Sequence, residues 1–225
     1  MAAGPALVAL SCGDPPALWE SLGFTVDGDH CDVDGVRITL TGEGTGMRAW
    51  TLAGITLDEG TSGEHVGRLE GLRTTVVDGP VAGSPVHPNG VTAIDHVVVM
   101  TPDHERTITA FETAGLELRR TRAIVDTYGA PGSQAFFRPK GAIIELVGPV
   151  DPQPDAGGAR FFGLAFTAED LDAVAAHLGD RLKPAKQAVQ KGRRIATLAS
   201  SAGSAVPIAI MSPHVPGIDQ DLQQP

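Results

Sequence analysis

Short apolar runs alternate with turn residues along the chain, and one order of elements recurs three times. In the clearest copy, residues 93–100 form a Val-rich run typical of a buried strand. Residues 101–115 then place Ile108, Phe111 and Ala114 on one helical face, which predicts a helix that ends near a glycine. Gly and Pro separate three further predicted strands, at 116–125, 133–139 and 142–149.

The other two copies repeat this order with weaker signals. In the last copy we expect a strand at 160–167, a helix at 168–180, and strands at 193–200 and 206–213. In the first copy we expect a strand at 6–12, a short helix at 15–23, hairpin strands in 24–42 and a closing strand at 47–55. We therefore divide the chain into a degenerate module (1–56), a linker (57–90), a central module (91–150), a second linker (151–158) and a last module with its tail (159–225).

Composition narrows the classes of partner. The net charge of −10 disfavours nucleic acid and anionic membrane surfaces, and the 4% content of aromatic residues argues against base stacking. No stretch reaches 18 apolar residues, and the two cysteines are too few for a disulfide framework, so we expect a cytoplasmic protein. No glycine-rich phosphate loop occurs between a strand and a helix, so we expect no nucleotide cofactor.

The segments AIDHVVVMTPD, AIIELVGP and GLAFTAEDLD, in this order, resemble the vicinal oxygen chelate superfamily, which includes glyoxalases, dioxygenases and bleomycin-resistance proteins. The resemblance implies an α+β fold of repeated βαβββ modules, whose curled mixed β-sheets surround a cleft. It also implies metal ligands on the first and last strand of each module, and His96 and Glu145 match these positions in the central module. An imidazole and a carboxylate suit a divalent metal such as Zn, Ni, Fe or Mn, which would bind two adjacent substrate oxygens.

The last module departs from this pattern. Gly163 stands where the resemblance places the second histidine, and Ala209 stands where it places the second carboxylate. Two of four expected ligands are therefore missing, which argues against glyoxalase I activity. A third ligand would have to come from His87, His214 or a second copy of the chain.

Three further residues are candidates for contact with a small-molecule substrate. Tyr128 lies in a loop where it either binds substrate or is a surface aromatic, while Gln134 and Arg138 flank an aromatic on one strand face that either lines the cleft or faces solvent. We predict that the basic stretch 186–194 is a solvated hairpin.

Two functions stay open at this point. One is a metal-dependent lyase or dioxygenase in which His96 and Glu145 are catalytic. The other is a metal-free protein that sequesters a small molecule, as the bleomycin-resistance members do. The first module either packs beside the other two or supports a homodimer contact.

Overall fold

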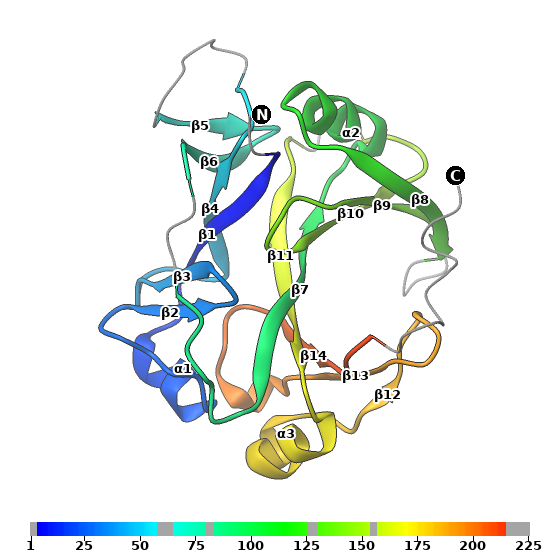
Figure 1. The fold of residues 1–225 in the computed structure, drawn as a ribbon. Helices are drawn as coiled ribbons and strands as arrows, with labels where there is room; N and C mark the ends of the chain where they lie inside the picture. The colour runs from blue at the N-terminus through cyan, green and yellow to red at the C-terminus, as the bar shows by residue number, and fades with distance from the viewer. Residues whose placement is uncertain (1–3, 58–64, 80–82, 126–129, 154–156, 215–225) are drawn as a thin grey trace.

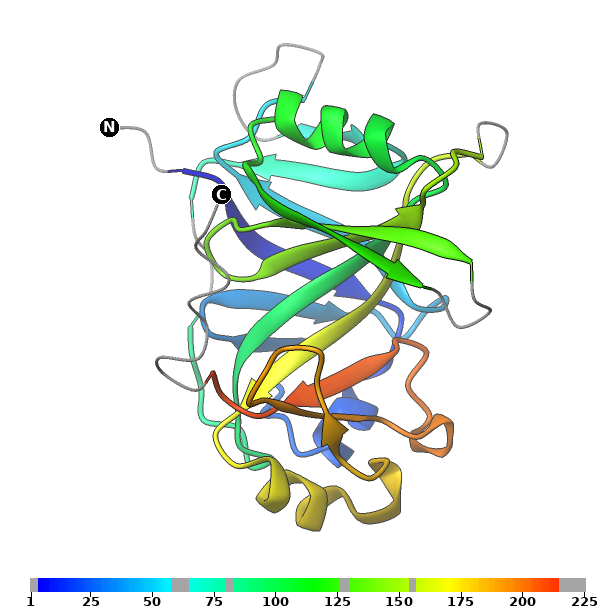
Figure 2. The same cartoon turned by 90° about the vertical axis from the view of Figure 1, so that its right-hand side faces the viewer.

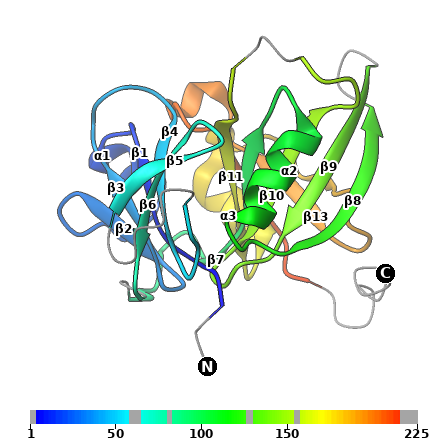
Figure 3. The same ribbon diagram turned by 90° about the horizontal axis from the view of Figure 1, so that it is seen from above.

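A computed structural model describes residues 4–57, 65–79, 83–125, 130–153 and 157–214. Two curled, mixed β-sheets pack against each other and share one hydrophobic core (Figure 1). Seen from above, sheet A lies on one side of the molecule and sheet B on the other (Figure 3). The prediction of an α+β fold with curled mixed sheets is confirmed.

Sheet A has six strands in the order β2-β3-β1-β4-β6-β5. A short helix, α1 (Pro16–Ser21), follows its first strand and begins with prolines, which the first helical turn tolerates. The strands are β1 (Ala6–Cys12), β2 (His30–Val33), β3 (Val36–Leu40), β4 (Met47–Ala53), β5 (His65–Leu69) and β6 (Leu72–Val77).

Sheet B has eight strands in the order β12-β13-β14-β11-β7-β10-β9-β8. Helices α2 (His104–Thr113) and α3 (Leu171–Leu178) lie at opposite ends of it (Figure 2), with short 3₁₀ helices η2 (Gly179–Arg181) and η3 (Ser200–Ala202). The strands are β7 (Val91–Met100), β8 (Leu118–Val125), β9 (Pro131–Phe137), β10 (Ile143–Pro149), β11 (Arg160–Ala168), β12 (Lys186–Gln187), β13 (Arg194–Thr197) and β14 (Ile208–Met211).

The two helices of sheet B begin at aspartates that cap them. The Asp103 side chain accepts a hydrogen bond from the Arg106 backbone N–H, and the Asp170 side chain accepts two from the first turn of α3. Phe111 of α2 is fully buried, and its ring lies 5.2 Å from that of Phe137 on β9. The predicted helices at 101–115 and 168–180 therefore exist, but each is shorter than its apolar pattern suggested.

Both sheets share one central arrangement. In sheet B, β7 and β11 are antiparallel, and each has a parallel neighbour, β10 and β14 respectively. In sheet A, β1 and β4 are antiparallel, and their parallel neighbours are β3 and β6. Sheet A is thus a reduced copy of sheet B.

This arrangement corrects the expectation for residues 57–90. They were predicted to be a linker, but they contain β5 and β6, which complete sheet A beside β4. The strand predicted at 47–55 also does not close the first module, because β4 pairs antiparallel with β1 just as β11 pairs with β7. No helix in the described part of the chain has the length and apolar character needed to span a bilayer.

Candidate functional site

Side-chain alternation gives sheet B one apolar face and one half-exposed polar face. On β10, Ile144 and Leu146 are fully buried, whereas Glu145 between them points to the other face. On β7, Val97 is buried while His96 points to the polar face. The polar face of β7 and β10 therefore carries the two residues that the sequence singled out.

His96 and Glu145 meet on this face. Their strands are parallel neighbours in which His96 pairs with Ile143 and Glu145 with Val98. The distance from His96 Nε2 to Glu145 Oε2 is 3.4 Å, and each side chain is 15% exposed. Both side chains therefore keep some contact with solvent.

A β-bulge in β7 brings a third ionisable group to the pair. His96 pairs with Ala165 on β11, but Ile94 pairs with the next residue, Phe166, so Asp95 is an extra residue in β7. The bulge breaks the usual alternation, and the Asp95 carboxylate lies beside the neighbouring imidazole, with 2.9 Å between Oδ1 and His96 Nδ1.

Asp95 is held as an anion by a buried arginine. The Arg193 Nη2 lies 2.5 Å from Asp95 Oδ2, and the Thr167 hydroxyl donates to the same oxygen at 2.8 Å. The Arg193 side chain is completely buried, and its Nε also donates to the Ser212 carbonyl. Burial alone would raise the pKa of Asp95, but the hydrogen bonds from His96 and Arg193 and the charge of Arg193 outweigh it and hold that pKa well below its usual value.

This ion pair overturns one sequence-based expectation. Residues 186–194 were predicted to be a solvated hairpin, and β12 and β13 do pair there, but Arg193 points inward and is buried. The sequence held no signal for this contact, because its partner Asp95 is remote in the chain and reaches the site only through the bulge.

The charge of Asp95 fixes the protonation of His96. A carboxylate accepts hydrogen bonds but cannot donate them, so His96 Nδ1 must carry the proton that lies between them. In a neutral imidazole, Nε2 would then present a lone pair to the Glu145 carboxylate, which is repulsive. The contact is attractive only when one further proton is held by Nε2 or by Glu145.

The other oxygen of Glu145 is held from β9 and β8. Gln134 Nε2 donates to Glu145 Oε1, and Gln134 Oε1 accepts from Arg122 Nε at 2.9 Å. The Arg122 guanidinium also lies 5.6 Å from the centre of the Phe136 ring. A continuous polar network thus runs from Arg193 across the sheet to Arg122.

The remaining predicted residues lie apart from this network. Arg138 follows the end of β9 and lines a cavity of about 530 Å³ together with Asp95, Ile143 and His214. Tyr128 falls outside the described residues, so its role stays a prediction.

The two candidate third ligands also have other surroundings. His87 is buried, accepts a hydrogen bond from the Thr25 backbone N–H at 3.1 Å and packs on Phe24, with 5.4 Å between the ring centres. His214 Nε2 lies 3.9 Å from Asp95 Oδ2 and 3.2 Å from Arg193, whereas His96 contacts the other oxygen of Asp95.

The strand register shows which residues of the last module correspond to His96 and Glu145. Glu145 on β10 pairs with Val98 on β7, and in the other half of the sheet Ala209 on β14 pairs with Ala165 on β11. The parallel pairs are equivalent, so Ala209 is the structural counterpart of Glu145.

By the same register, Gly163 is the counterpart of His96. His96 lies two residues before Val98, the partner of Glu145, and Gly163 lies two residues before Ala165, the partner of Ala209. A Cβ atom at Gly163 would lie 2.5 Å from the Pro207 carbonyl oxygen, so a side chain would not fit without a backbone shift. Within the described residues no three His, Cys, Asp or Glu side chains are grouped to hold a metal. Two ligands fall short of the three that catalytic zinc sites take from the protein, so the residues do not fit a firmly held metal.

Comparison with known proteins agrees with this fold. The family model for the Glyoxalase/Bleomycin resistance protein/Dioxygenase superfamily matches residues 95–197, and no curated protein matches the chain. A mutant of 4-hydroxymandelate synthase from Streptomyces coelicolor is 15% identical, with 92% of both chains covered and a TM-score of 0.60. Methylmalonyl-CoA epimerase from Mycobacterium tuberculosis is 23% identical over 56% of this chain and 91% of that chain, with a TM-score of 0.45.

Proposed function

We propose that this chain belongs to the glyoxalase/bleomycin resistance protein/dioxygenase superfamily. We propose further that it transfers a proton on a small carbonyl compound bound at the polar face of sheet B. The observation that carries the proposal is the 3.4 Å contact between His96 Nε2 and Glu145 Oε2, since Asp95 occupies His96 Nδ1 and leaves Nε2 to give or take a proton.

The geometry supports an enolisation. The Glu145 carboxylate takes a proton from the carbon next to the carbonyl group, while the His96 Nε2–H donates a hydrogen bond to the carbonyl oxygen where negative charge develops. Gln134 and Arg122 fix the carboxylate from the opposite side. Glu145 then returns the proton to the same carbon or transfers it to a neighbouring atom of the substrate. Either step restores the starting protonation of His96 and Glu145.

The adjoining cavity gives the substrate a place. Its volume of about 530 Å³ suits a small molecule, and its lining includes Asp95, Arg138 and Ile143, the residue that pairs with His96. An exposed guanidinium there would bind a carboxylate or a second oxygen of the substrate. The cavity supports Arg138 as a substrate-binding residue, and the contacts that His96, Glu145 and Gln134 make with one another support them as the reacting or adjoining groups.

A second candidate is binding without turnover. It is favoured by the replacement of two ligand positions by Gly163 and Ala209, because the cleft then lacks the groups that would complete a metal centre. In that case the polar network would recognise the ligand and no proton would move.

Exchange of substrate hydrogen for deuterium tests the proposal. In D₂O, the protein should accelerate loss of the α-proton signals of pyruvate or hydroxyacetone, followed by NMR. Glu145→Gln should reduce the rate by about 10²- to 10⁴-fold, as expected for loss of a general base. Arg119→Gln, at an exposed ion pair on β8, is the control and should leave the rate unchanged.

Two results would contradict proton transfer. One is equal rates for the wild type and Glu145→Gln. The other is no exchange above the buffer rate for either compound while line broadening shows that the compound binds, which would favour the second candidate.

A further inference from the structure

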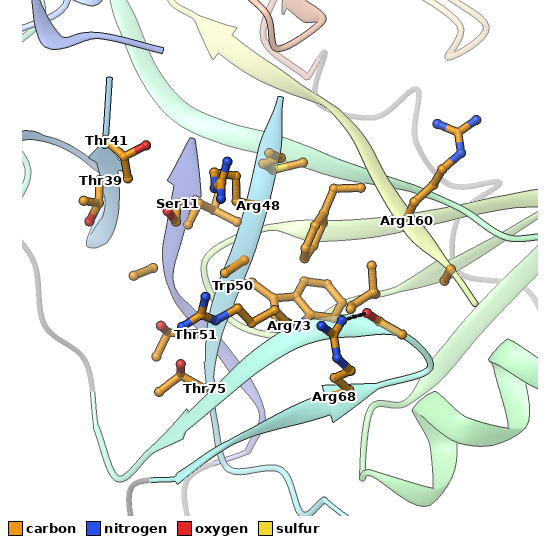
Figure 4. Close-up of a pocket in the computed structure, with 18 residues that line it drawn as sticks. Ser11, Thr39, Thr41, Arg48, Trp50, Thr51, Arg68, Arg73, Thr75 and Arg160 are labelled. Atoms are coloured by element: carbon orange, nitrogen blue, oxygen red, sulfur yellow. Dashed lines mark hydrogen bonds between the residues drawn. The ribbon is translucent and has the colours of Figure 1, made fainter. Parts of the chain in front are cut away.

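A second cavity lies on sheet A, and neither His96 nor Glu145 lines it. It has a volume of about 700 Å³ and lies over the half-exposed face of β3, β1, β4 and β6, next to the start of β11 (Figure 4). Sheet A belongs to the part of the chain to which the sequence assigned no site, so this cavity has no role in the chemistry proposed above.

Four arginines from four different strands surround this cavity. They are Arg48 on β4, Arg68 on β5, Arg73 on β6 and Arg160 on β11, and no aspartate or glutamate is among the lining residues (Figure 4). This local excess of four positive charges contrasts with the net charge of −10 for the whole chain. A concave site lined by charges of one sign attracts ligands of the opposite sign.

Within the described part of the chain, no carboxylate balances the charge of these guanidinium groups. Among the described residues none of the four forms an ion pair with a carboxylate. Arg68 donates to the Gly71 carbonyl at 2.7 Å and Arg48 donates to the Glu43 carbonyl at 3.3 Å, contacts that leave their charge uncompensated. By contrast, Arg37, on the same sheet, forms a two-point ion pair with an aspartate.

Hydroxyl groups cover the floor of the cavity. Ser11 on β1 pairs with Thr39 on β3, and Thr51 on β4 pairs with Thr75 on β6. Side-chain alternation places all four on the lined face, where they offer hydrogen-bond donors that bear no charge. Phe161, half-buried at the start of β11, adds an apolar wall.

We propose that this cavity binds an organic phosphate. A phosphate monoester carries a charge of about −1.5 to −2 at neutral pH and three acceptor oxygens, which match several guanidinium groups and hydroxyl donors better than a single carboxylate does. The organic part of the ligand would pack on Phe161. The site needs no metal and does not depend on the reaction at sheet B.

Isothermal titration calorimetry with phenyl phosphate, at a constant ionic strength of the buffer, tests the assignment. Phenyl phosphate should bind, and inorganic phosphate should bind more weakly because it lacks the apolar contact. Arg73→Gln and Arg68→Gln should each raise the Kd by about tenfold, the effect of losing one charge-assisted hydrogen bond. Arg119→Gln, an exposed strand arginine outside the cavity, should not change it.

Each alternative outcome overturns the assignment. Equal loss of affinity in Arg73→Gln and Arg119→Gln would mean diffuse attraction to the surface. Citrate binding as tightly as phenyl phosphate would make this a carboxylate site. No binding of phenyl phosphate would leave the cavity without an anionic ligand. Thermal unfolding of each variant, expected to match the wild type, shows that the substitutions act on binding.

Discussion

The half-exposed faces of the two sheets share a strand arrangement but differ in chemistry. Where β7 pairs with β10, sheet B carries Val98 beside Glu145, and where β1 pairs with β3, sheet A carries Ser11 beside Thr39. On sheet B, one internally paired network joins Arg193 to Arg122, whereas the four arginines around the sheet A cavity have no carboxylate partner among the described residues. The same backbone thus supports a proton-transfer site on one sheet and an anion site on the other, because function depends on the side chains placed on a fold.

The ion pairing on sheet B should have its largest effect on the free energy of unfolding. Arg193→Met leaves the buried Asp95 carboxylate without its partner, and we expect a loss of about 3–5 kcal/mol in the free energy of unfolding. Urea denaturation measures it. Arg194→Gln breaks an exposed ion pair with Asp172, and its effect on the free energy of unfolding should be much smaller. Equal effects of the two substitutions would contradict a buried, structurally essential ion pair.

The same network should make stability depend on acid. Because the pKa of Asp95 is lower in the folded protein than in the unfolded chain, its stabilisation is fully present above the unfolded value of about 4 and is lost as the pH falls below it. Unfolding free energies between pH 5 and pH 3 should therefore fall less steeply in Asp95→Asn than in the wild type. Parallel curves for the two proteins would show that Asp95 does not titrate differently on folding.

Zn²⁺ affinity tests whether sheet B lacks a metal ligand at position 209. Ala209→Glu supplies a third ligand at the position that register equates with Glu145, and should raise Zn²⁺ affinity by about tenfold or more over the wild type. Calorimetry with ZnCl₂ measures the change. Thr75→Glu on sheet A is the matched control, since that strand face holds no imidazole, and should not create a site. Tight, stoichiometric Zn²⁺ binding by the wild type would contradict the incomplete ligand set.

The smallest effect is expected on sheet A. Arg73→Gln removes a charge that has no carboxylate partner among the described residues, so its free energy of unfolding should change by no more than about 0.5 kcal/mol. Urea denaturation measures this change as well. A large loss of stability would show that Arg73 is structural, and would contradict an arginine held available for a ligand.

The meeting of His96 with Glu145 could be predicted because both lie on strands of one module with clear apolar runs. Alignment of the modules identified Gly163 and Ala209 as the counterparts of His96 and Glu145, and the strand register agrees with this alignment. These features depend on local pattern and repetition, which a single sequence displays.

Other features could not be predicted, because they arise from contacts between distant segments. Arg193 reaches Asp95 only because a bulge turns the aspartate toward the imidazole. Strand β5 carries glycine and charged residues, so its place in sheet A depends on pairing with β6 rather than on its own apolar pattern. The arginines around the sheet A cavity come from four strands, three in sheet A and one in sheet B, and none stands out in its own segment.

We infer that Asp95 fixes one proton on His96 Nδ1, so that Nε2 and Glu145 share a second. Long-range ¹H–¹⁵N NMR of histidine-labelled protein tests this directly, because the ring nitrogen shifts report which nitrogen is protonated. We predict that His96 Nδ1 carries a proton in the folded protein, and that the Nε2 shift changes in Glu145→Gln. An Nδ1 without a proton, or an Nε2 shift that does not respond to Glu145→Gln, would contradict the account.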